Sequence, residues 1–184
     1  AYIRNMLRQR DEGCFSCPFR CSKRAMIKDP EYPWTTKGPE HETMALVGSN
    51  CGVGDLKDIF RANYLCNELG MDTITAGATI SCAMELFETG ALSEKDIGYP
   101  LPFGNAPNMF RALRETASRQ GFGHVLAEGG AAVAEKYGRP ELFMGVKKQG
   151  MPAWHPQGIE VIGLQYATSN VGACHTKATL PFYE

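Results

Sequence analysis

The sequence predicts a mostly α, multihelical fold, and three observations support this. Apolar residues recur at helical spacing in four stretches between residues 55 and 137. Glycine follows the last periodic residue of several stretches, as it commonly does where helices end. Strand-like patterns are weak, and 146–148 and 161–164 are the two candidates. We therefore expect helices to form the body of the chain.

Caps and apolar spacing place the four helices in order along the chain. Asp55 can cap the first helix at its N-terminus, and Gly70 can end it. Further helices are expected over residues 79–89 and 124–137, each followed by glycine, and from Asn108 to a stop at Gly121.

The flanking regions give a less regular pattern. Residues 1–13 carry several charges and predict a short basic helix, whereas residues 22–53 show no sustained period and predict a long irregular segment. The residue pattern changes after residue 148, from helical periodicity to an extended segment and a stretch of small residues. We therefore expect a helical domain over 1–148 and the start of a second domain over 149–184. The beginning at Ala1 and the ending at Glu184 lead us to expect a piece of a longer protein.

Composition excludes several classes of protein. The 184 residues carry a formal net charge of −1, and no basic block suggests a nucleic-acid partner. No apolar run approaches the length of a membrane span, and no secretory signal is present in the sequence. Of the seven cysteines, three lie close together, which favours metal ligation in a reducing compartment over disulfides. We therefore expect a cytoplasmic protein.

The cysteine cluster is the strongest chemical signal in the chain. Cys14, Cys17 and Cys21 follow the spacing C-x2-C-x3-C, with a proline after the second cysteine. Zinc would need a second pair of cysteines or histidines at finger spacing, and the sequence has none. The uneven spacing suits a loop around an iron–sulfur cluster, which needs a fourth ligand from elsewhere.

A second candidate site lies between the first two predicted helices. Asn67 and Asp72 place an amide and a carboxylate on either side of Gly70, where the backbone can approach a ligand closely. A carboxylate there could accept N–H groups of a heterocycle. On the residues alone, an ordinary helix cap with a solvated aspartate is the favoured interpretation.

Two further segments carry titratable groups. Glu42 follows Glu40 and His41 in the predicted irregular segment, where a buried carboxylate could move protons, although a surface loop is the simpler interpretation. His175 and Lys177 end a stretch of small residues that could pack against something bulky. For His175, structural and catalytic roles are about evenly favoured.

Taken together, these segments resemble the aldehyde ferredoxin oxidoreductase family of tungsten-pterin enzymes. The resemblance rests on the order of several motifs over nearly the whole chain: Cys14-x2-Cys17-Pro-x2-Cys21, Gly38-Pro-Glu-His-Glu42, Leu69-Gly-Met-Asp-Thr-Ile74, Leu126-Ala-Glu-Gly129, Tyr166-Ala-Thr-Ser-Asn170 and Gly172-Ala-Cys-His175. It implies the fold of that family's two C-terminal helical domains.

The resemblance also implies roles for single residues. Cys14, Cys17 and Cys21 would be three ligands of a [4Fe-4S] cluster, with the fourth ligand beyond residue 184. Asn67, Gly70, Met71, Asp72 and Lys177 would contact a pterin of a tungsten (or molybdenum) bis-pterin cofactor, with Asn67 and Met71 departing from the family's D-x-x-G-L-D. Glu42 and His175 would lie near the metal and act in catalysis. The family's E-x-x-H iron site reads Arg61-Ala-Asn-Tyr64 here, so that site is not expected.

The implied activity is oxidation of a small aldehyde to a carboxylic acid, with electrons passing through the cluster to ferredoxin. The chain alone is expected to be inactive. The sequence leaves open whether the protein forms a homo-oligomer. One alternative is the tungsten subunit of an aromatic acyl-CoA reductase of the benzoyl-CoA type. Another alternative is a non-catalytic iron–sulfur electron-transfer module.

Overall fold

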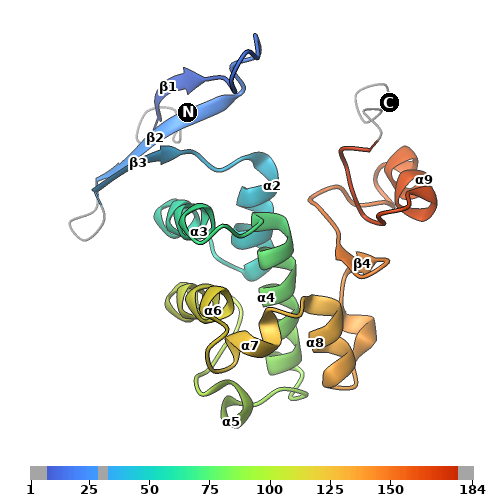
Figure 1. The fold of residues 1–184 in the computed structure, drawn as a ribbon. Coiled ribbons are helices and arrows are strands. Elements are labelled where there is room, and N and C mark those ends of the chain that lie inside the picture. The colour runs from blue at the N-terminus through green and yellow to red at the C-terminus, as the bar shows by residue number, and fades with distance from the viewer. Residues whose placement is uncertain (1–7, 29–32, 178–184) are drawn as a thin grey trace.

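The computed structural model describes residues 8–28 and 33–177, and helices dominate it (Figure 1). This confirms the mostly α fold. The helices of the first part are α2 (His41–Thr43), η1 (Met44–Gly48), η2 (Ser49–Cys51), α3 (Leu56–Glu68), α4 (Thr73–Glu88) and α5 (Glu94–Ile97). Those of the second part are α6 (Ala106–Ser118), α7 (Gly123–Leu126), α8 (Gly130–Lys136), η3 (Pro140–Leu142) and α9 (Glu160–Thr168).

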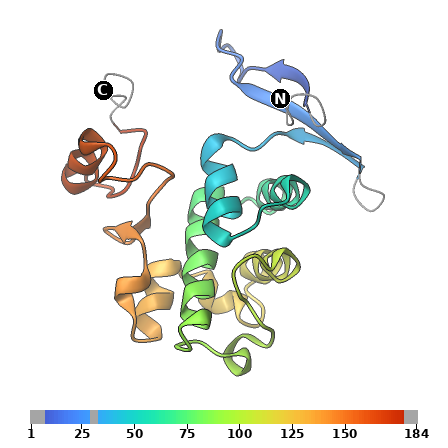
Figure 2. The same ribbon diagram turned by 180° about the vertical axis from the view of Figure 1, so that it is seen from behind.

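Helix α4 is the central element, with α3 and α6 on one side and α8 on the other (Figures 1 and 2). Its residues from Gly77 to Met84 are buried without interruption, as expected for a helix that is apolar on all faces. A side chain at Gly77 would place its Cβ only 2.6 Å from the backbone carbonyl carbon of Leu46. The absence of that side chain therefore lets η1 pack backbone-to-backbone on α4, which sets the position of the preceding α2.

Aspartates cap the two central helices. The Asp55 carboxylate accepts a hydrogen bond from the Lys57 N–H at 2.8 Å and begins α3, as predicted. Gly70 adopts φ +68° just after α3, where the N–H of Met71 bonds back to the Cys66 carbonyl. Asp72 accepts from the Thr75 N–H at 2.7 Å and begins α4 six residues before the predicted start at residue 79.

The helix predicted over residues 124–137 is two helices. Gly129 adopts φ +89° between α7 and α8, a conformation that breaks the helix and suits glycine. The following Gly130 N–H donates to Oγ1 of Thr79 on α4 at 3.0 Å. The break therefore ties α8 to the central helix, a contact that local periodicity does not reveal.

The N-terminal prediction is wrong for the described residues. Residues 8–12 form strand β1 (Arg8–Glu12), which pairs antiparallel with β2 (Ser22–Lys28), and β2 pairs antiparallel with β3 (Pro33–Lys37). Cross-strand ion pairs join Lys23 to Asp11 at 3.0 Å and Arg24 to Glu12 at 2.8 Å. Residues 1–7 of the predicted helix lie outside the described residues.

The segment 22–53 is also more regular than predicted. It supplies β2 and β3, two of the three strands of the N-terminal sheet, and then α2, η1 and η2. The sheet extends from the helical body (Figure 1) and meets it at Ala25 of β2, which is buried with Phe60 of α3. Because this contact is small, neighbouring strands define the sheet more than a core does. The π-type geometry of η1 has no simple sequence signal.

The C-terminal part has its own small core. A hairpin of β4 (Gly145–Val146) and β5 (Gln149–Gly150) leads to an extended crossing and to α9, where Ile162, Tyr166 and Ala173 are buried together. The 146–148 strand prediction is thus partly confirmed, but 161–164 is helical because α9 packs Ile162 and Tyr166 inward. The division of the chain after residue 148 stays a prediction. Within the described ranges, no helix is both long and apolar enough to cross a membrane.

Candidate active site

The structure brings Glu42 and His175 together. Glu42 lies on α2, His175 lies beyond α9, and 3.4 Å separates Oε1 of the carboxylate from Nε2 of the imidazole. The glutamate side chain is 13% exposed and the histidine side chain 26%. The surface-loop interpretation of Glu42 is therefore wrong for this residue, which sits on a helix and faces a C-terminal imidazole.

The extended crossing after β5 holds the Glu42 carboxylate. Oε2 accepts the backbone N–H of Ala153 at 2.9 Å, and Oε1 accepts the indole N–H of Trp154 at 2.5 Å. The hydroxyl of Tyr166, on α9, donates to the Trp154 carbonyl at 3.0 Å. Both carboxylate oxygens are thus fixed by N–H donors.

Helix α9 positions the histidine segment. The Gln165 side-chain amide donates to the Cys174 carbonyl, next to His175. Burial, followed by the nearby Glu42 charge, raises the pKa of Tyr166 to about 12, so its hydroxyl stays protonated as a donor near neutral pH. The hydroxyl partner Thr176 lowers the pKa of Cys174. The segment before His175 is thus held against α9 by the Gln165 hydrogen bond.

Cys14, Cys17 and Cys21 share the loop between β1 and β2, and all three are exposed free thiols. The Cys17 N–H donates to the Cys14 carbonyl at 3.0 Å, which forms a tight turn. Within residues 8–28 and 33–177, no group of three or more metal-binding side chains is gathered in a ligating arrangement. The donor set fits three corners of an iron–sulfur cluster in its chemistry, although the loop does not draw the sulfurs together.

Three other cysteines are poor candidates for a fourth ligand. Cys51, Cys66 and Cys82 are buried in the helical core. Burial raises the pKa of the Cys51 and Cys66 thiols to about 12 and that of Cys82 to about 11. A raised pKa disfavours the thiolate that would bind a metal.

The predicted pterin motif borders a cavity of about 240 Å³. Met71 and Asp72 line it together with Ala127 and Gly129, so two segments of the family resemblance meet there. Asp72 is exposed, and one of its carboxylate oxygens accepts the hydrogen bond that caps α4. The other oxygen is left for a ligand. Asn67 and Gly70 are exposed at the end of α3. The residues alone favour a helix C-cap with a solvated aspartate; Gly70 does follow the end of α3, whereas Asp72 caps the following helix.

Lys177 does not line the cavity beside Asp72. It is exposed and lines a separate cavity of about 630 Å³ along α9, with Leu164 and Val171. Both apolar residues are exposed, at 65% and 43%. The structure therefore joins Glu42 to His175 but leaves Lys177 and Asp72 on different cavities.

Sequence reasoning missed Trp154 and Tyr166 as part of the site. The hydrogen bond from Trp154 to Glu42 joins residues 112 positions apart, which no local pattern contains, and Tyr166 takes part through the Trp154 carbonyl. The available signal was Trp154 itself, a large side chain with one N–H donor in an extended crossing.

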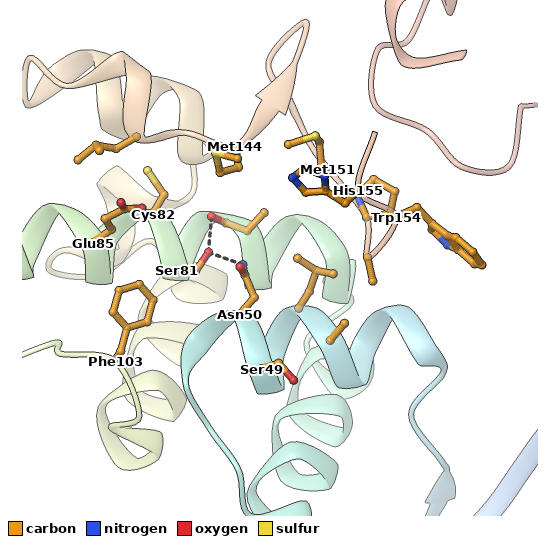
Figure 3. A pocket seen from close by; sticks show the side chains of 16 residues that line it. Ser49, Asn50, Ser81, Cys82, Glu85, Phe103, Met144, Met151, Trp154 and His155 are labelled. Atoms are coloured by element: carbon orange, nitrogen blue, oxygen red, sulfur yellow. Dashed lines mark hydrogen bonds between the residues drawn. The ribbon is translucent and has the colours of Figure 1, made fainter. Parts of the chain in front are cut away.

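A further cavity of about 490 Å³ lies behind this crossing (Figure 3). Trp154 lies at one end of it, with Phe103 and Glu85 toward the other. In the middle, the Asn50 amide donates to Ser81 Oγ at 2.6 Å, and Ser81 donates to the Ala78 carbonyl at 3.1 Å. Cavities of this size suit small organic ligands.

The family model for domains 2 and 3 of aldehyde ferredoxin oxidoreductase matches residues 1–184. The chain belongs to this family. It is 44% identical over 172 residues to tungsten-containing aldehyde ferredoxin oxidoreductases of Pyrococcus horikoshii and Pyrococcus abyssi. These matches cover 91% of the chain but 28% of each relative, so the chain spans little more than a quarter of their length.

A more distant relative and a solved structure extend the comparison. The WOR-like subunit of an aliphatic sulfonate oxidoreductase of Pyrococcus furiosus is 31% identical over 116 residues. The active-site complex BamBC of benzoyl coenzyme A reductase, solved with 1,5-dienoyl-CoA, matches with a TM-score of 0.70 at 26% identity. It covers 90% of this chain and 25% of that one. The family's helical fold is therefore shared with a reductase.

Proposed function

We propose that this chain is part of a tungsten-dependent oxidoreductase that converts aldehydes to carboxylic acids. The overall reaction is RCHO + H2O → RCOO− + 3 H+ + 2 e−. The observation that carries the proposal is the contact between Glu42 and His175, at 3.4 Å. The family resemblance assigns both residues to the neighbourhood of the metal, and the names of the 44% identical relatives support the substrate class.

The chain's own residues manage protons in this proposal. Glu42 is held by the Ala153 and Trp154 donors, so its charge stays oriented toward His175 Nε2. The imidazole, the more exposed partner, can accept a proton released from the hydrated aldehyde and pass it toward Oε1. Because both side chains are mostly buried, the exchange is shielded from bulk water.

The cofactor site is proposed to involve Asn67, Gly70, Met71 and Asp72, with Lys177 as a cation for an acidic group. Asp72 keeps one carboxylate oxygen beyond its helix cap, and that oxygen can accept a ring N–H. A bis-pterin tungsten (or molybdenum) centre, when bound, supplies the two-electron oxidation.

Electrons are proposed to leave through a [4Fe-4S] cluster held by Cys14, Cys17 and Cys21, toward ferredoxin. The exposure of all three thiols on one loop supports an exit near the surface. Arg20 is an exposed cation on this loop, which suits an acidic protein partner.

The substitution Glu42→Gln in the holoenzyme tests the catalytic assignment. It keeps the size of the side chain and one acceptor oxygen, but it removes the charge opposite His175 and turns an NH2 group toward one of the two N–H donors. We expect aldehyde oxidation to fall by about 100-fold or more with unchanged tungsten and iron content. The matched control is Glu40→Gln, whose carboxylate pairs with Lys37 and Ser22 instead. A wild-type rate in Glu42→Gln would refute the proton role.

A second candidate is the active-site subunit of a benzoyl-CoA-type reductase, favoured by the structural match at TM-score 0.70. Assays of the holoenzyme with an aldehyde and with an aromatic acyl-CoA distinguish the two. A non-catalytic electron-transfer module is the third alternative, and metal analysis tests it. Iron without tungsten or molybdenum would favour the module.

A further inference from the structure

The hairpin of β4 and β5 turns through two lysines in an uncommon backbone conformation. Lys147 and Lys148 have φ angles of +53° and +66°, and the strands pair directly on either side of them. A two-residue hairpin turn of type I′ needs positive φ at both positions, which asparagine and glycine adopt far more readily than lysine. An unfavourable backbone conformation persists only where surrounding contacts hold it. The contacts of the two lysines therefore indicate what this turn does.

Each lysine contacts a different part of the protein. Nζ of Lys147 donates a hydrogen bond to the Ser169 backbone carbonyl at 2.7 Å. Nζ of Lys148 lies 3.3 Å from Oε1 of Glu135, on α8. Ser169 is the residue at which α9 ends, where backbone carbonyls lack helical partners and a cation is favourable. The turn therefore holds the end of α9 through Lys147 and contacts α8 through Lys148.

Strand β4 also lies directly on the turn that follows α9. Gly172 has φ +83°, and a Cβ atom at this position would collide with the Val146 carbonyl oxygen. The Val146 side chain packs against the small core that includes Tyr166 and Ala173. The hairpin and the turn are thus in backbone-to-backbone contact, a close approach that glycine permits.

A chain of hydrogen bonds leads from Lys147 toward His175. The Ser169 carbonyl, which accepts from Lys147, also accepts the Gly172 N–H at 3.2 Å. The Gly172 carbonyl in turn accepts the Cys174 N–H at 2.8 Å, and His175 is the next residue. The lysine therefore acts on the same short segment that presents the imidazole to the carboxylate.

We propose that Lys147 is a positioning residue that holds His175 opposite Glu42. Its ammonium group ties the end of α9 to the hairpin, and the close packing at Gly172 carries that constraint toward the histidine. The inference rests on the proposed function and deepens it, because that function has the Glu42–His175 pair move protons. A displacement of about 1 Å in such a pair can cost on the order of 100-fold in rate.

The substitution Lys147→Asn in the holoenzyme tests this role. Asparagine adopts positive φ readily, so the turn can still form, but its short side chain does not reach the Ser169 carbonyl. We expect kcat for aldehyde oxidation to fall about tenfold and KM to change less than twofold. Lys148→Asn is the matched control, because it alters the same turn but removes only the Glu135 contact, and it should keep kcat within about twofold. The melting temperature should fall no further in Lys147→Asn than in this control.

Two further measurements separate positioning from a merely structural role. Lys147→Arg restores a long cationic donor and should recover most of the lost kcat. Diethyl pyrocarbonate acylates a free imidazole nitrogen, and peptide mass spectrometry gives its rate at each histidine without any assay of activity. We expect the rate at the partly buried His175 to rise about threefold in Lys147→Asn. The exposed His124, on α7, is the internal reference and should keep its rate.

The outcomes separate this inference from the proposed function. A wild-type holoenzyme that oxidises no aldehyde would refute the proposed function, and the modification rates of His175 would still test the role of Lys147. An unchanged modification rate of His175 in Lys147→Asn would overturn the inference, whatever the activity. Equal losses of kcat in Lys147→Asn and Lys148→Asn would also overturn it, because they would indicate an effect of the turn alone.

Discussion

The indole N–H of Trp154 donates a hydrogen bond to Glu42 Oε1 at 2.5 Å, 112 positions earlier in the chain. The same oxygen lies 3.4 Å from His175 Nε2. Trp154 thus holds the carboxylate that faces the histidine, and its ring lies 6.0 Å from that of His41. The extended crossing is therefore a structural support for the candidate active site.

Replacing Trp154 with Phe keeps an aromatic ring at this position and removes the indole N–H that donates to Glu42. A hydrogen bond to a charged group contributes about 1.5–3 kcal/mol, so we expect kcat/KM to fall by roughly 10- to 100-fold. Steady-state kinetics of the holoenzyme measures the effect. A wild-type kcat/KM in the variant would contradict the supporting role of the indole N–H.

Asp72 and Asp55 provide a matched pair for the cofactor site. Each caps a helix with one backbone hydrogen bond, at 2.7 and 2.8 Å. Asparagine caps helices about as well as aspartate, so neither Asp72→Asn nor Asp55→Asn should lower the free energy of unfolding by more than about 0.5 kcal/mol. If Asp72 contacts the pterin, Asp72→Asn alone should reduce the tungsten content of the purified holoenzyme. Equal tungsten content in both variants would leave Asp72 as a cap only.

Gly77→Ala tests the packing that positions α2. Alanine favours helices over glycine by up to about 1 kcal/mol, but its Cβ would meet the Leu46 backbone at 2.6 Å. Because backbone cannot rotate away as a side chain can, we expect a net loss of about 2 kcal/mol in the free energy of unfolding. Denaturant unfolding measures the change. Gly54→Ala is the control, since a Cβ there meets nothing within 4 Å. Equal stability of the two variants would contradict the close approach.

Stability should fall in alkaline solution. Burial raises the pKa of Cys51 and Cys66 from 9.0 to about 12, so the folded state keeps protons that the unfolded state releases. The stabilisation is complete below about pH 9 and is lost as pH rises toward 12. Unfolding by urea between pH 8 and 11 should show a declining free energy. Cys51→Ala should make the decline shallower, and an unchanged slope would contradict the burial effect.

The helical body could be predicted because its signals are local. Asp55 and Gly70 bound α3 through contacts within a few residues, and α6 begins and ends close to its predicted limits. The sheet could not, since β1 depends on partners such as Lys23 and Arg24 across a loop. Likewise 161–164 has strand-forming residues, yet the burial of Ile162 and Tyr166 against the crossing makes it helical.

The sequence by itself determined the family and the helical fold class, because motif order and helix caps lie in consecutive residues. It also predicted a metal-binding role for three clustered thiols. Only the tertiary structure decided that Glu42 meets His175, that Trp154 holds the carboxylate, and that a cavity lies behind the same wall. Those relationships join segments more than a hundred residues apart. They depend on how η1 and α9 pack against their neighbours, which is a property of the folded core rather than of any local pattern.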